Sequence, residues 1–227
     1  MTPFAIAFHH ATPHGILAAV HLPDSSEPVP TPVLDRLHPA EAAQARTLGG
    51  YRQVSFVGGR LALAAAVSWA GAPVGPILPD DRGAPRLPRG WTGSVSHKRT
   101  LAVGMIARDV DGTLGCDLED YGPPREGIAE RVLRPEELDE VMRLPAERRW
   151  ISILLRFSLK EALYKALDPH VRRWVGFHEV AVHPELQGRA RLSLHLAAGE
   201  GPFEASARYD WLHGRVLTSV RLTAPTR

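Results

Sequence analysis

The sequence of 227 residues predicts an α+β protein built from two successive halves. Apolar residues recur with helical spacing at residues 52–69 and again at 146–166, which indicates two long helices, each with a buried face. Short apolar stretches bounded by Gly, Pro or Asp indicate strands before and after each helix. The first group of elements gives way to the second near residues 106–112, so we expect halves at residues 1–108 and 109–227. No sequence repeat accompanies this division.

The first half is expected to begin with a strand pair followed by two helices. Residues 4–8 and 15–22 are short apolar stretches around a turn rich in His, Pro and Gly, which favours a β-hairpin. Pro39 is typical of the first turn of a helix, and this helix should run to about Leu48. In the next helix, at residues 52–69, apolar side chains at helical spacing form one face: Val54, Val57, Leu61, Ala65 and Trp69.

A long loop and three strands are expected next. Residues 71–93 contain too many Pro and Gly residues for a regular element. Strands are expected at residues 92–96, 101–106 and 113–118. Because residues 109–112 have the composition of a hairpin turn, we expect the last two strands to pair.

The second half is expected to be helical first and then β-rich. Helices are predicted at residues 128–133, 135–142 and 146–166, and Asp168 with Pro169 should end the last one. Four β-like stretches follow, at residues 176–182, 190–196, 203–209 and 216–222.

Composition and charge indicate an ordinary globular protein. The chain is 44% hydrophobic and 23% charged, which argues against disorder or a fibrous repeat. A net charge of +2 gives no indication of a nucleic-acid or membrane partner. The single cysteine, Cys116, cannot form an intramolecular disulfide. No apolar run approaches the roughly 20 residues of a membrane span, and the start of the chain lacks the pattern of a secretory leader, so we expect a cytoplasmic protein.

Two carboxylates on one predicted strand are candidate metal ligands. Asp117 and Glu119 lie two residues apart, so both side chains should leave the same face while Leu118 points the other way. Mg²⁺ prefers oxygen ligands and commonly completes its shell with phosphates of the substrate. The alternative is a solvated strand end, because an Asp-x-Glu pattern is common there.

The long predicted helix of the second half carries a further acidic residue between two lysines. Glu161 and Lys165 are i,i+4 neighbours and could form an ordinary surface ion pair. However, apolar residues surround the helix nearly completely, so Lys160, Glu161 and Lys165 should lie close to a buried or interfacial surface. These apolar residues are Leu154, Phe157, Leu163 and Tyr164.

Residues 93–98, with the sequence G-S-V-S-H-K, place a hydroxyl, an imidazole and an ammonium where a strand meets a loop. Such a cluster can bind phosphate oxygens. A capped turn is the structural alternative. A serine hydrolase using Ser96, His97 and Asp117 is a further alternative, which the missing G-x-S-x-G elbow disfavours. Adjacent residues of a strand also point to opposite faces.

Three of these segments together resemble a known enzyme family. They are G-S-V-S-H at residues 93–97, G-C-D-L-E at 115–119 and F-S-L-K-E-A at 157–162. Their order and spacing resemble the G-x-x-S-H, G-x-D-x-E and W/F-S-x-K-E-A motifs of the Sfp/EntD-type 4′-phosphopantetheinyl transferases. Upstream, residues 52–60 and 82–85 are similar to further segments of this family.

The resemblance covers about residues 39–170 and includes three departures from the family pattern. Ala84 stands where many relatives have lysine, which weakens the expected contact of that turn with a CoA phosphate. Cys116 replaces a β-branched aliphatic residue, and Phe157 occupies the usual tryptophan position. None of the three changes a member of the acidic trio.

The resemblance implies the 4′-phosphopantetheinyl transferase fold, a pseudo-dimer of two similar α+β halves with the active site in the cleft between them. It implies a monomer that transfers the 4′-phosphopantetheine group of coenzyme A (CoA) to a serine of an apo acyl or peptidyl carrier protein, with Mg²⁺ as cofactor and 3′,5′-ADP as product. Such enzymes activate polyketide, nonribosomal peptide and siderophore synthases. The alternatives are a noncatalytic carrier-protein or CoA-binding module, and a serine hydrolase using Ser96.

The same resemblance assigns roles to individual residues. Asp117, Glu119 and Glu161 would bind Mg²⁺. Catalysis would depend on Glu161, Lys165 and Asp117, with either Glu161 or a metal-bound water that it orients as the base. Three groups of residues would bind CoA. Arg52, Arg60, Ser96 and His97 would contact the 3′-phosphate and adenosine end, and the turn with Arg82, Gly83 and Pro85 would lie near adenine. Lys160 and Lys165 would contact the diphosphate.

The carrier protein is expected to dock on the segment after residue 119. Carrier proteins of this family's pathways present an acidic helix, which requires an apolar surface ringed by basic groups. The apolar candidates are Ile128, Val132, Leu133, Leu138 and Val141. The basic candidates are Arg125, Arg131, Arg134 and Arg143. The alternative is that the apolar residues pack inward.

Overall fold

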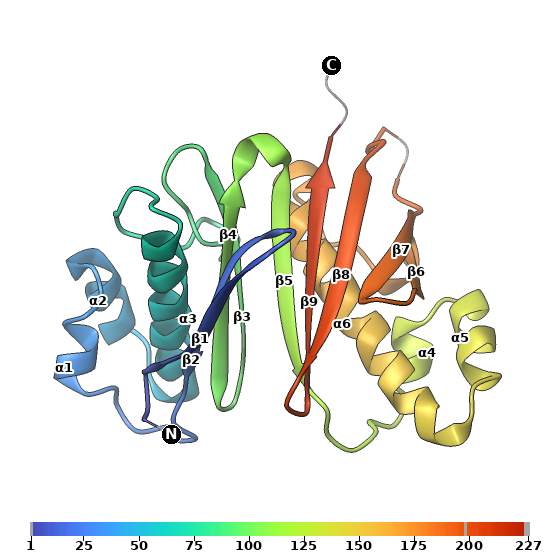
Figure 1. The fold of residues 1–227 in the computed structure, drawn as a ribbon, viewed down its shortest axis with the longest axis horizontal. Helices are drawn as coiled ribbons and strands as arrows, with labels where there is room; N and C mark the ends of the chain where they lie inside the picture. Colours follow the sequence, from blue (N-terminus) through green and yellow to red (C-terminus); the bar gives the residue numbers. More distant parts are fainter. Residues whose placement is uncertain (1, 198, 225–227) are drawn as a thin grey trace. The chain divides into compact units, whose positions relative to one another are not determined.

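The computed structural model describes residues 2–197 and 199–224, which form two compact units. The first unit ends at Leu114 and the second begins at Gly115. Each unit contains one β-sheet with a long helix packed on it (Figure 1). The predicted α+β class, with two α+β halves, is confirmed.

The first unit has a four-stranded antiparallel sheet with the strand order β1-β2-β4-β3. Its strands and two of its helices, α2 and α3, agree with the predicted ones to within a few residues at each end, whereas the short helix α1 was not predicted. The strands are β1 (Ile6–Thr12), β2 (Gly15–His21), β3 (Trp91–Lys98) and β4 (Leu101–Arg108). The helices are α1 (Thr31–Leu34), α2 (Pro39–Arg46) and α3 (Gly50–Trp69).

Glycines bring α3 close to the sheet of the first unit. At Gly104 of β4, an added Cβ atom would lie only 2.6 Å from the backbone nitrogen of Leu63. At Gly58 of α3, it would lie 2.1 Å from Cδ2 of Leu22. Any side chain at these two positions would therefore collide with its neighbours, so the close packing of α3 requires glycine at both.

A buried carboxylate joins α2 to the long loop that follows α3. Oε2 of Glu41 accepts a hydrogen bond from the backbone N–H of His38 (3.2 Å), which caps the start of α2. Oε1 accepts one from the backbone N–H of Ile77 (2.6 Å). Further along, Pro79 and Pro85 form an isolated bridge that closes a tight turn. The loop is therefore a structured connection, as expected from its composition.

The second unit has a five-stranded sheet with the strand order β5-β9-β8-β7-β6. Leu159, Leu163 and Leu167 of its long helix are fully buried in an apolar cluster with strand residues. The strands are β5 (Thr113–Asp120), β6 (Val180–Pro184), β7 (Arg189–Leu194), β8 (Glu204–Leu212) and β9 (Arg215–Thr223). The helices are α4 (Ile128–Val132), α5 (Pro135–Met142) and α6 (Ala146–Val171), with a 3-10 turn η2 (Phe177–Glu179).

The expected pairing of residues 101–106 with residues 113–118 is wrong. β5 lies next to β9 in the sheet of the second unit, and a 3-10 turn, η1 (Asp109–Asp111), precedes it. The reason is the packing of β5 on α6: a Cβ atom at Gly115 would lie 1.8 Å from the carbonyl oxygen of Ala162. This long-range contact selects the sheet in which β5 lies, whatever the local turn composition.

Helix α6 continues beyond its expected end and includes Pro169. Proline lacks a backbone N–H, but near the end of a helix it removes only one intrahelical hydrogen bond. The helix ends instead where Arg172 adopts a left-handed conformation (φ 46°) and donates its backbone N–H to the carbonyl oxygen of Asp168 (3.0 Å). Neither α6 nor any other helix in the described part of the chain combines the length and apolar character needed to cross a membrane.

Candidate active site

Two buried carboxylates lie on one face of β5. Asp117 and Glu119 are 5% and 3% exposed, and because they are two residues apart, both leave the same side of the strand. Gly115, two residues earlier on that side, contacts the backbone of α6 at Ala162. The face that carries the two carboxylates is therefore the face that α6 covers.

Two side chains of α6 bind Asp117. Lys165 Nζ donates to Oδ1 (3.0 Å) and Ser158 Oγ donates to Oδ2 (2.9 Å). Lys165 also donates to the carbonyl oxygen of Cys116 (2.9 Å). Burial is the largest single effect and disfavours the charged form of Lys165, but Asp117, Cys116 and Glu161 together outweigh it and raise the pKa of Lys165 above its ordinary value. Lys165 is therefore protonated at neutral pH beside Asp117.

Glu119 has a cationic partner on the segment that follows β5. Arg125 Nη2 lies 3.3 Å from Glu119 Oε2. The side chain of Arg125 is 51% exposed, whereas that of Glu119 is 4% exposed, so the cation reaches inward from the surface. Ion pairs with a solvent-exposed member contribute little to stability. Arg125 can therefore leave Glu119 at small cost when another cation takes its place.

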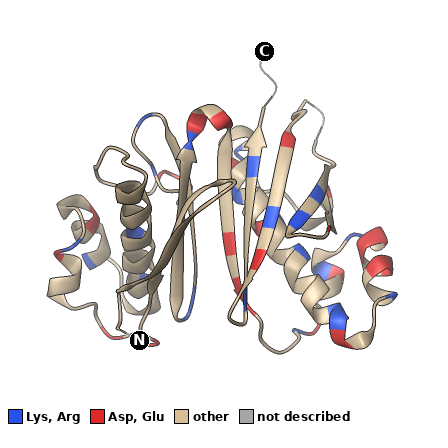
Figure 2. Cartoon of the chain, in the orientation of Figure 1, with Lys and Arg blue, Asp and Glu red and all other residues tan. Residues whose placement is uncertain are grey.

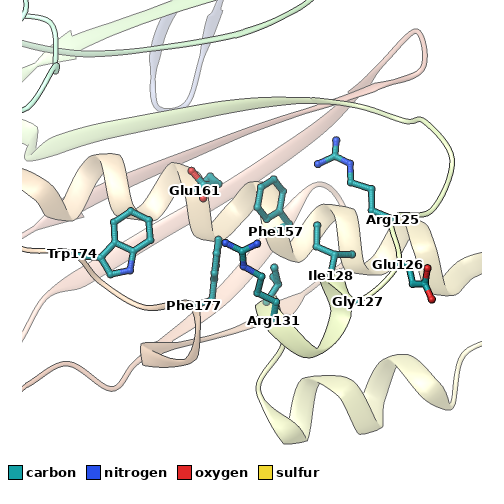
Figure 3. Close-up of a pocket in the computed structure, with 10 residues that line it drawn as sticks. Arg125, Glu126, Gly127, Ile128, Arg131, Phe157, Glu161, Trp174 and Phe177 are labelled. Carbon is teal, nitrogen blue, oxygen red and sulfur yellow. The ribbon is translucent and has the colours of Figure 1, made fainter.

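A cavity of about 440 Å³ lies in the second unit and has Glu161 in its wall. Three segments form the wall: the stretch from the end of β5 through α4, helix α6, and the segment that follows α6. The lining residues are Arg125, Glu126, Gly127, Ile128, Arg131, Val132, Phe157, Glu161, Trp174 and Phe177. Figure 3 shows that Glu161 and Phe157 come from α6, and that the carboxylate of Glu126 points away from the others. The cavity thus combines aromatic side chains with the carboxylate of Glu161 and two arginines.

The structure corrects the expected contact between Lys160 and the CoA diphosphate. Lys160 has no exposed surface, and its ammonium donates to Glu137 and to the carbonyl oxygens of Val132 and Phe177. Burial lowers the pKa of Lys160, although the carboxylate of Glu137 opposes this effect. An ammonium has three donor hydrogens, and these contacts use all of them. Lys165, in contrast, is partly exposed.

The acidic trio has the donor chemistry for Mg²⁺, but only two of its members share one strand. Asp117 and Glu119 supply buried carboxylate oxygens, the ligand type that Mg²⁺ prefers. Their cationic partners Lys165 and Arg125 show that this face of β5 attracts positive charge. Among the described residues, no three or more His, Cys, Asp or Glu side chains are grouped to hold a metal ion. The participation of Glu161 therefore stays a prediction.

In the first unit, a buried arginine has an unsatisfied donor. Arg60 of α3 is 4% exposed, and its Nε has no hydrogen-bond partner among the described residues. Its guanidinium lies 4.7 Å from the ring centre of Phe56. Burial lowers the pKa of Arg60, partly offset by Glu41. Arg52 lies two helical turns earlier on the same side of α3 and is exposed, so this side can bind an anion.

Ser96 and His97 leave opposite faces of β3, as expected for adjacent residues of a strand. Val95 contacts α3 at Gly59, and His97 lies two residues further along, on the same face as Val95. Ser96 is on the other face and is 8% exposed. His97 therefore shares a face of the sheet with α3, and Ser96 does not.

The turn that contains Arg82, Gly83 and Pro85 has a defined backbone conformation. Oδ1 of Asp80 accepts the backbone N–H groups of Arg82 and Ala84, each at 2.9 Å. Gly83 has φ +89°, a conformation that side-chain-bearing residues rarely adopt. The exposed backbone of this turn is available to a ligand.

Comparison with known proteins identifies the family. Residues 113–220 match the 4′-phosphopantetheinyl transferase superfamily, and residues 40–107 match the 4′-phosphopantetheinyl transferase N-terminal domain. The chain is 34% identical over 203 residues to the 4′-phosphopantetheinyl transferase Svp of Streptomyces mobaraensis, with 83% of this chain and 80% of that protein covered. The chain belongs to the 4′-phosphopantetheinyl transferase superfamily.

Two further relatives agree with this assignment. The chain is 31% identical to the 4′-phosphopantetheinyl transferase PptT of Mycobacterium tuberculosis, over 75% of this chain and 79% of that protein. It is 27% identical to enterobactin synthase component D of Salmonella typhimurium, over 80% and 76%. The resemblance found in the motifs is confirmed, and so is the prediction of a transferase. The family assignment argues against the serine hydrolase alternative, and so do the opposite directions of Ser96 and His97 on β3.

In this phosphopantetheinyl transferase, part of the expected carrier-protein surface is buried. Val132, Leu133 and Val141 are at most 2% exposed and form a small core cluster, so they pack inward and the docking role expected for them is wrong. Ile128 and Leu138 are only partly buried and pack against this cluster.

The four arginines expected at this surface have different environments. Arg125 and Arg131 are exposed and line the cavity. Arg134 contacts Glu136 and the carbonyl oxygen of His178, so its charge is already engaged. Arg143 is exposed at the end of α5 and does not line the cavity.

Three residues of the site were not anticipated from the sequence. Trp174 is 78% exposed at the cavity, and Phe177 lines it from η2. Ser158 binds Asp117 from within the F-S-L-K-E-A segment. No periodic pattern in the sequence marks an exposed tryptophan after a long helix. Ser158 could have been found, because it lies about one helical turn before Glu161 on the buried side of α6.

Proposed function

We propose that this enzyme transfers the 4′-phosphopantetheine group of CoA to a serine of an apo acyl or peptidyl carrier protein, in a Mg²⁺-dependent reaction that releases 3′,5′-ADP. The main support is the pair of buried carboxylates on β5, Asp117 and Glu119. Lys165 donates a hydrogen bond to Asp117, and Glu161 lines the cavity of the same unit. We further propose that the enzyme is a monomer and lies in the cytoplasm, where a single, buried cysteine suits the reducing environment.

Asp117, Glu119 and Glu161 would hold the magnesium ion. When bound, Mg²⁺ would neutralise charge on the diphosphate oxygens. Ser158 and Lys165 fix the orientation of Asp117 by binding both of its oxygens. Because Lys165 stays protonated, it also supplies a positive charge close to the expected position of the diphosphate.

In the proposed reaction, the hydroxyl oxygen of the carrier serine attacks the β-phosphorus of CoA. A phosphorus–oxygen bond forms to serine, and the bond from the same phosphorus to the bridging oxygen breaks, so 3′,5′-ADP leaves with that oxygen. The carboxylate of Glu161 takes the serine proton, a role that contributes typically ~10²–10⁴-fold. Lys165 stabilises the charge that develops on the diphosphate oxygens.

The residues of the first unit would bind the other end of CoA. Arg60 has a buried Nε without a partner in the described chain, and an anionic oxygen would satisfy it. Arg52, on the same side of α3, and His97, on the α3-covered face of the sheet, would contact the 3′-phosphate. The backbone of the turn at Arg82, with Gly83 and Pro85, would contact adenine. Ser96 would act from the opposite face of β3 as a separate contact.

The proposal is tested by incubating the protein with an apo carrier protein, CoA and Mg²⁺, and measuring the mass of the carrier. A gain of one phosphopantetheine group, dependent on the carrier serine, supports the transferase. Glu161→Gln keeps the size of the side chain and should remove turnover while leaving CoA binding within a few-fold. Binding of CoA without any change in carrier mass would instead identify a noncatalytic module, and hydrolysis products without transfer would contradict the proposal.

A further inference from the structure

Lys160 and Glu161 are consecutive residues of α6 with different surroundings. Neighbouring residues of a helix point about 100° apart, so one can face a cavity while the next faces the interior. Glu161 lines the cavity, and Lys160 has no exposed surface. The charged group of Lys160 therefore lies inside the second unit, behind the cavity wall.

The ammonium of Lys160 binds three segments at once. Nζ donates to the carbonyl oxygen of Val132 at the end of α4 (2.8 Å) and to that of Phe177 in η2 (2.9 Å). The third bond goes to Oε2 of Glu137 in α5 (2.6 Å). Val132 and Phe177 both line the cavity. One buried cation thus connects α6 to the two other segments that form the wall.

Glu137 completes this connection and is itself fully buried. Its Oε1 accepts the backbone N–H of Val182 in β6 (2.6 Å), and its Oε2 also accepts the backbone N–H of Arg134 (2.8 Å). Buried polar groups that lose their partners are costly, and the two carbonyl oxygens bound by Lys160 face the same interior. Loss of the ammonium should therefore let α4 and η2 separate from α6.

A second ion pair between α6 and α5 provides a natural comparison. Arg156 of α6 is 5% exposed, and its Nη2 donates to Oε2 of Glu140 (2.8 Å). Arg156 also binds Ser152 within its own helix. None of these three residues lines the cavity. The two pairs are alike in helix, burial of the cation and charge, and the second does not hold the cavity wall. Glu140 differs from Glu137 in being 42% exposed and in also contacting His183.

We propose that Lys160 is a positioning residue that holds α4 and η2 against α6 and thereby shapes the surface that receives the acidic carrier protein. The role rests on the proposed function of the cavity. It is indirect: Lys160 acts through the backbone of Val132 and Phe177 and contacts neither substrate.

The test uses the full chain and two paired variants. Lys160→Met with Glu137→Gln removes the first ion pair without leaving an isolated buried charge, and Arg156→Met with Glu140→Gln does the same for the second. Lys160→Met alone shows the cost of the unpaired carboxylate. For each variant, we would measure the melting temperature, KM for CoA and for the carrier protein, kcat, and hydrogen–deuterium exchange of backbone amides.

The Lys160/Glu137 variant should recover part of the melting temperature that Lys160→Met loses, because Gln at position 137 still accepts one of the two backbone N–H groups that Glu137 binds. Its KM for the carrier should remain at least tenfold above that of the wild type. Its kcat and its KM for CoA should stay within threefold. Exchange should rise at residues 128–133 and 176–179. The Arg156/Glu140 variant should keep a normal KM for the carrier and normal exchange in both segments.

Other outcomes contradict the proposal. If KM for the carrier recovers together with the melting temperature, Lys160 acts through stability alone. If KM for CoA rises while KM for the carrier does not, Lys160 acts at the diphosphate. If the wild type itself transfers nothing, the proposed function fails, and the exchange measurement alone then decides whether Lys160 holds the cavity wall.

Discussion

The two long helices pack on their sheets in a similar way but bury different groups. Both lie against a glycine of a strand, α3 at Gly104 and α6 at Gly115. Beneath α3 the buried residues are mainly apolar or glycine, with Gln53 and Arg60 as the polar members. Beneath α6 they include Arg156, Ser158 and Lys160, and β5 adds the two buried carboxylates of Asp117 and Glu119. Figure 2 shows acidic residues along β5.

This difference indicates that the two units have different functions. Buried charges are costly unless they have partners, so we expect them mainly where they bind a ligand, take part in catalysis or stabilise a binding surface. The second unit contains several such partnered charges, including Lys165–Asp117 and Lys160–Glu137. The first has one buried guanidinium, that of Arg60, with an unsatisfied Nε. In the second unit the Nε of Arg156 is also unsatisfied, but this guanidinium pairs with Glu140. We therefore propose that the chemistry lies in the second unit and that Arg60 binds an anion in the first.

The largest effect is expected at Asp117. Asp117→Asn keeps the shape of the side chain but removes the charge next to Lys165. Transfer should fall by roughly 10³-fold, equivalent to about 4 kcal/mol in the barrier, because the proposed metal loses a charged ligand. Steady-state rates over a range of Mg²⁺ concentrations provide the measurement. Near-normal turnover at low Mg²⁺ would remove Asp117 from the metal site.

The shared glycine contacts should be equally intolerant in both units. A Cβ atom at Gly115 would lie 1.8 Å from a backbone oxygen, and one at Gly104 would lie 2.6 Å from a backbone nitrogen. Gly115→Ala and Gly104→Ala should each lower the free energy of unfolding by about 3 kcal/mol, measured by chemical denaturation. Gly122 has nothing within 4 Å, so Gly122→Ala serves as the control. A large loss at only one site would mean that the two helices pack differently.

Arg60→Met separates binding from stability in the first unit. KM for CoA should rise at least tenfold, because a hydrogen bond to a charged group contributes about 1.5–3 kcal/mol. The melting temperature should stay the same or increase, since a buried cation with an unsatisfied donor is removed. The preference for CoA over 3′-dephospho-CoA should shrink as well.

The control for Arg60 is Arg46→Met, which removes an arginine whose side chain is 53% exposed and pairs with Asp35. It should leave KM for CoA unchanged. A lower melting temperature in Arg60→Met with an unchanged KM for CoA would show that Arg60 is a structural residue. The proposed difference between the two units would then be wrong.

The smallest effect is expected on the surface of the second unit. Arg131 is exposed and lines the cavity, so Arg131→Glu should raise KM for an acidic carrier protein by about threefold to tenfold, with KM for CoA unchanged. The penalty should decrease as salt is added. Arg148→Glu, an exposed change near the start of α6, is the matched control. Equal penalties for both variants would indicate a general charge effect without a docking surface at the cavity.

Local signals in the sequence predicted the elements well but not their long-range partners. α5 begins at Pro135 and ends at Met142 as predicted, because proline and the acidic first turn mark its start. The partner of β5 was missed, because the hairpin-like composition of residues 109–112 is a local feature. The contact that decides the pairing, between Gly115 and Ala162, joins residues far apart in the chain.

The candidate site shows the same limit. The sequence predicted that Asp117 and Glu119 share a face, since strand geometry alone determines this. It did not predict that Lys160 points into the core, because the side of α6 that Lys160 faces depends on where α4, α5 and η2 pack. The opposite directions of Ser96 and His97 were predicted by the same geometry, since the two residues are adjacent on a strand.

The carboxylate of Glu137 has a consequence for how this protein behaves among other copies of itself. β6 is the outermost strand of its sheet, and such strands present unpaired N–H groups to which another chain can add a strand. The backbone N–H of Val182, in the middle of β6, donates its hydrogen bond to the carboxylate of Glu137. A foreign strand would have to displace a buried carboxylate to pair there. The same side chain that organises the cavity wall thus protects the enzyme against edge-to-edge aggregation.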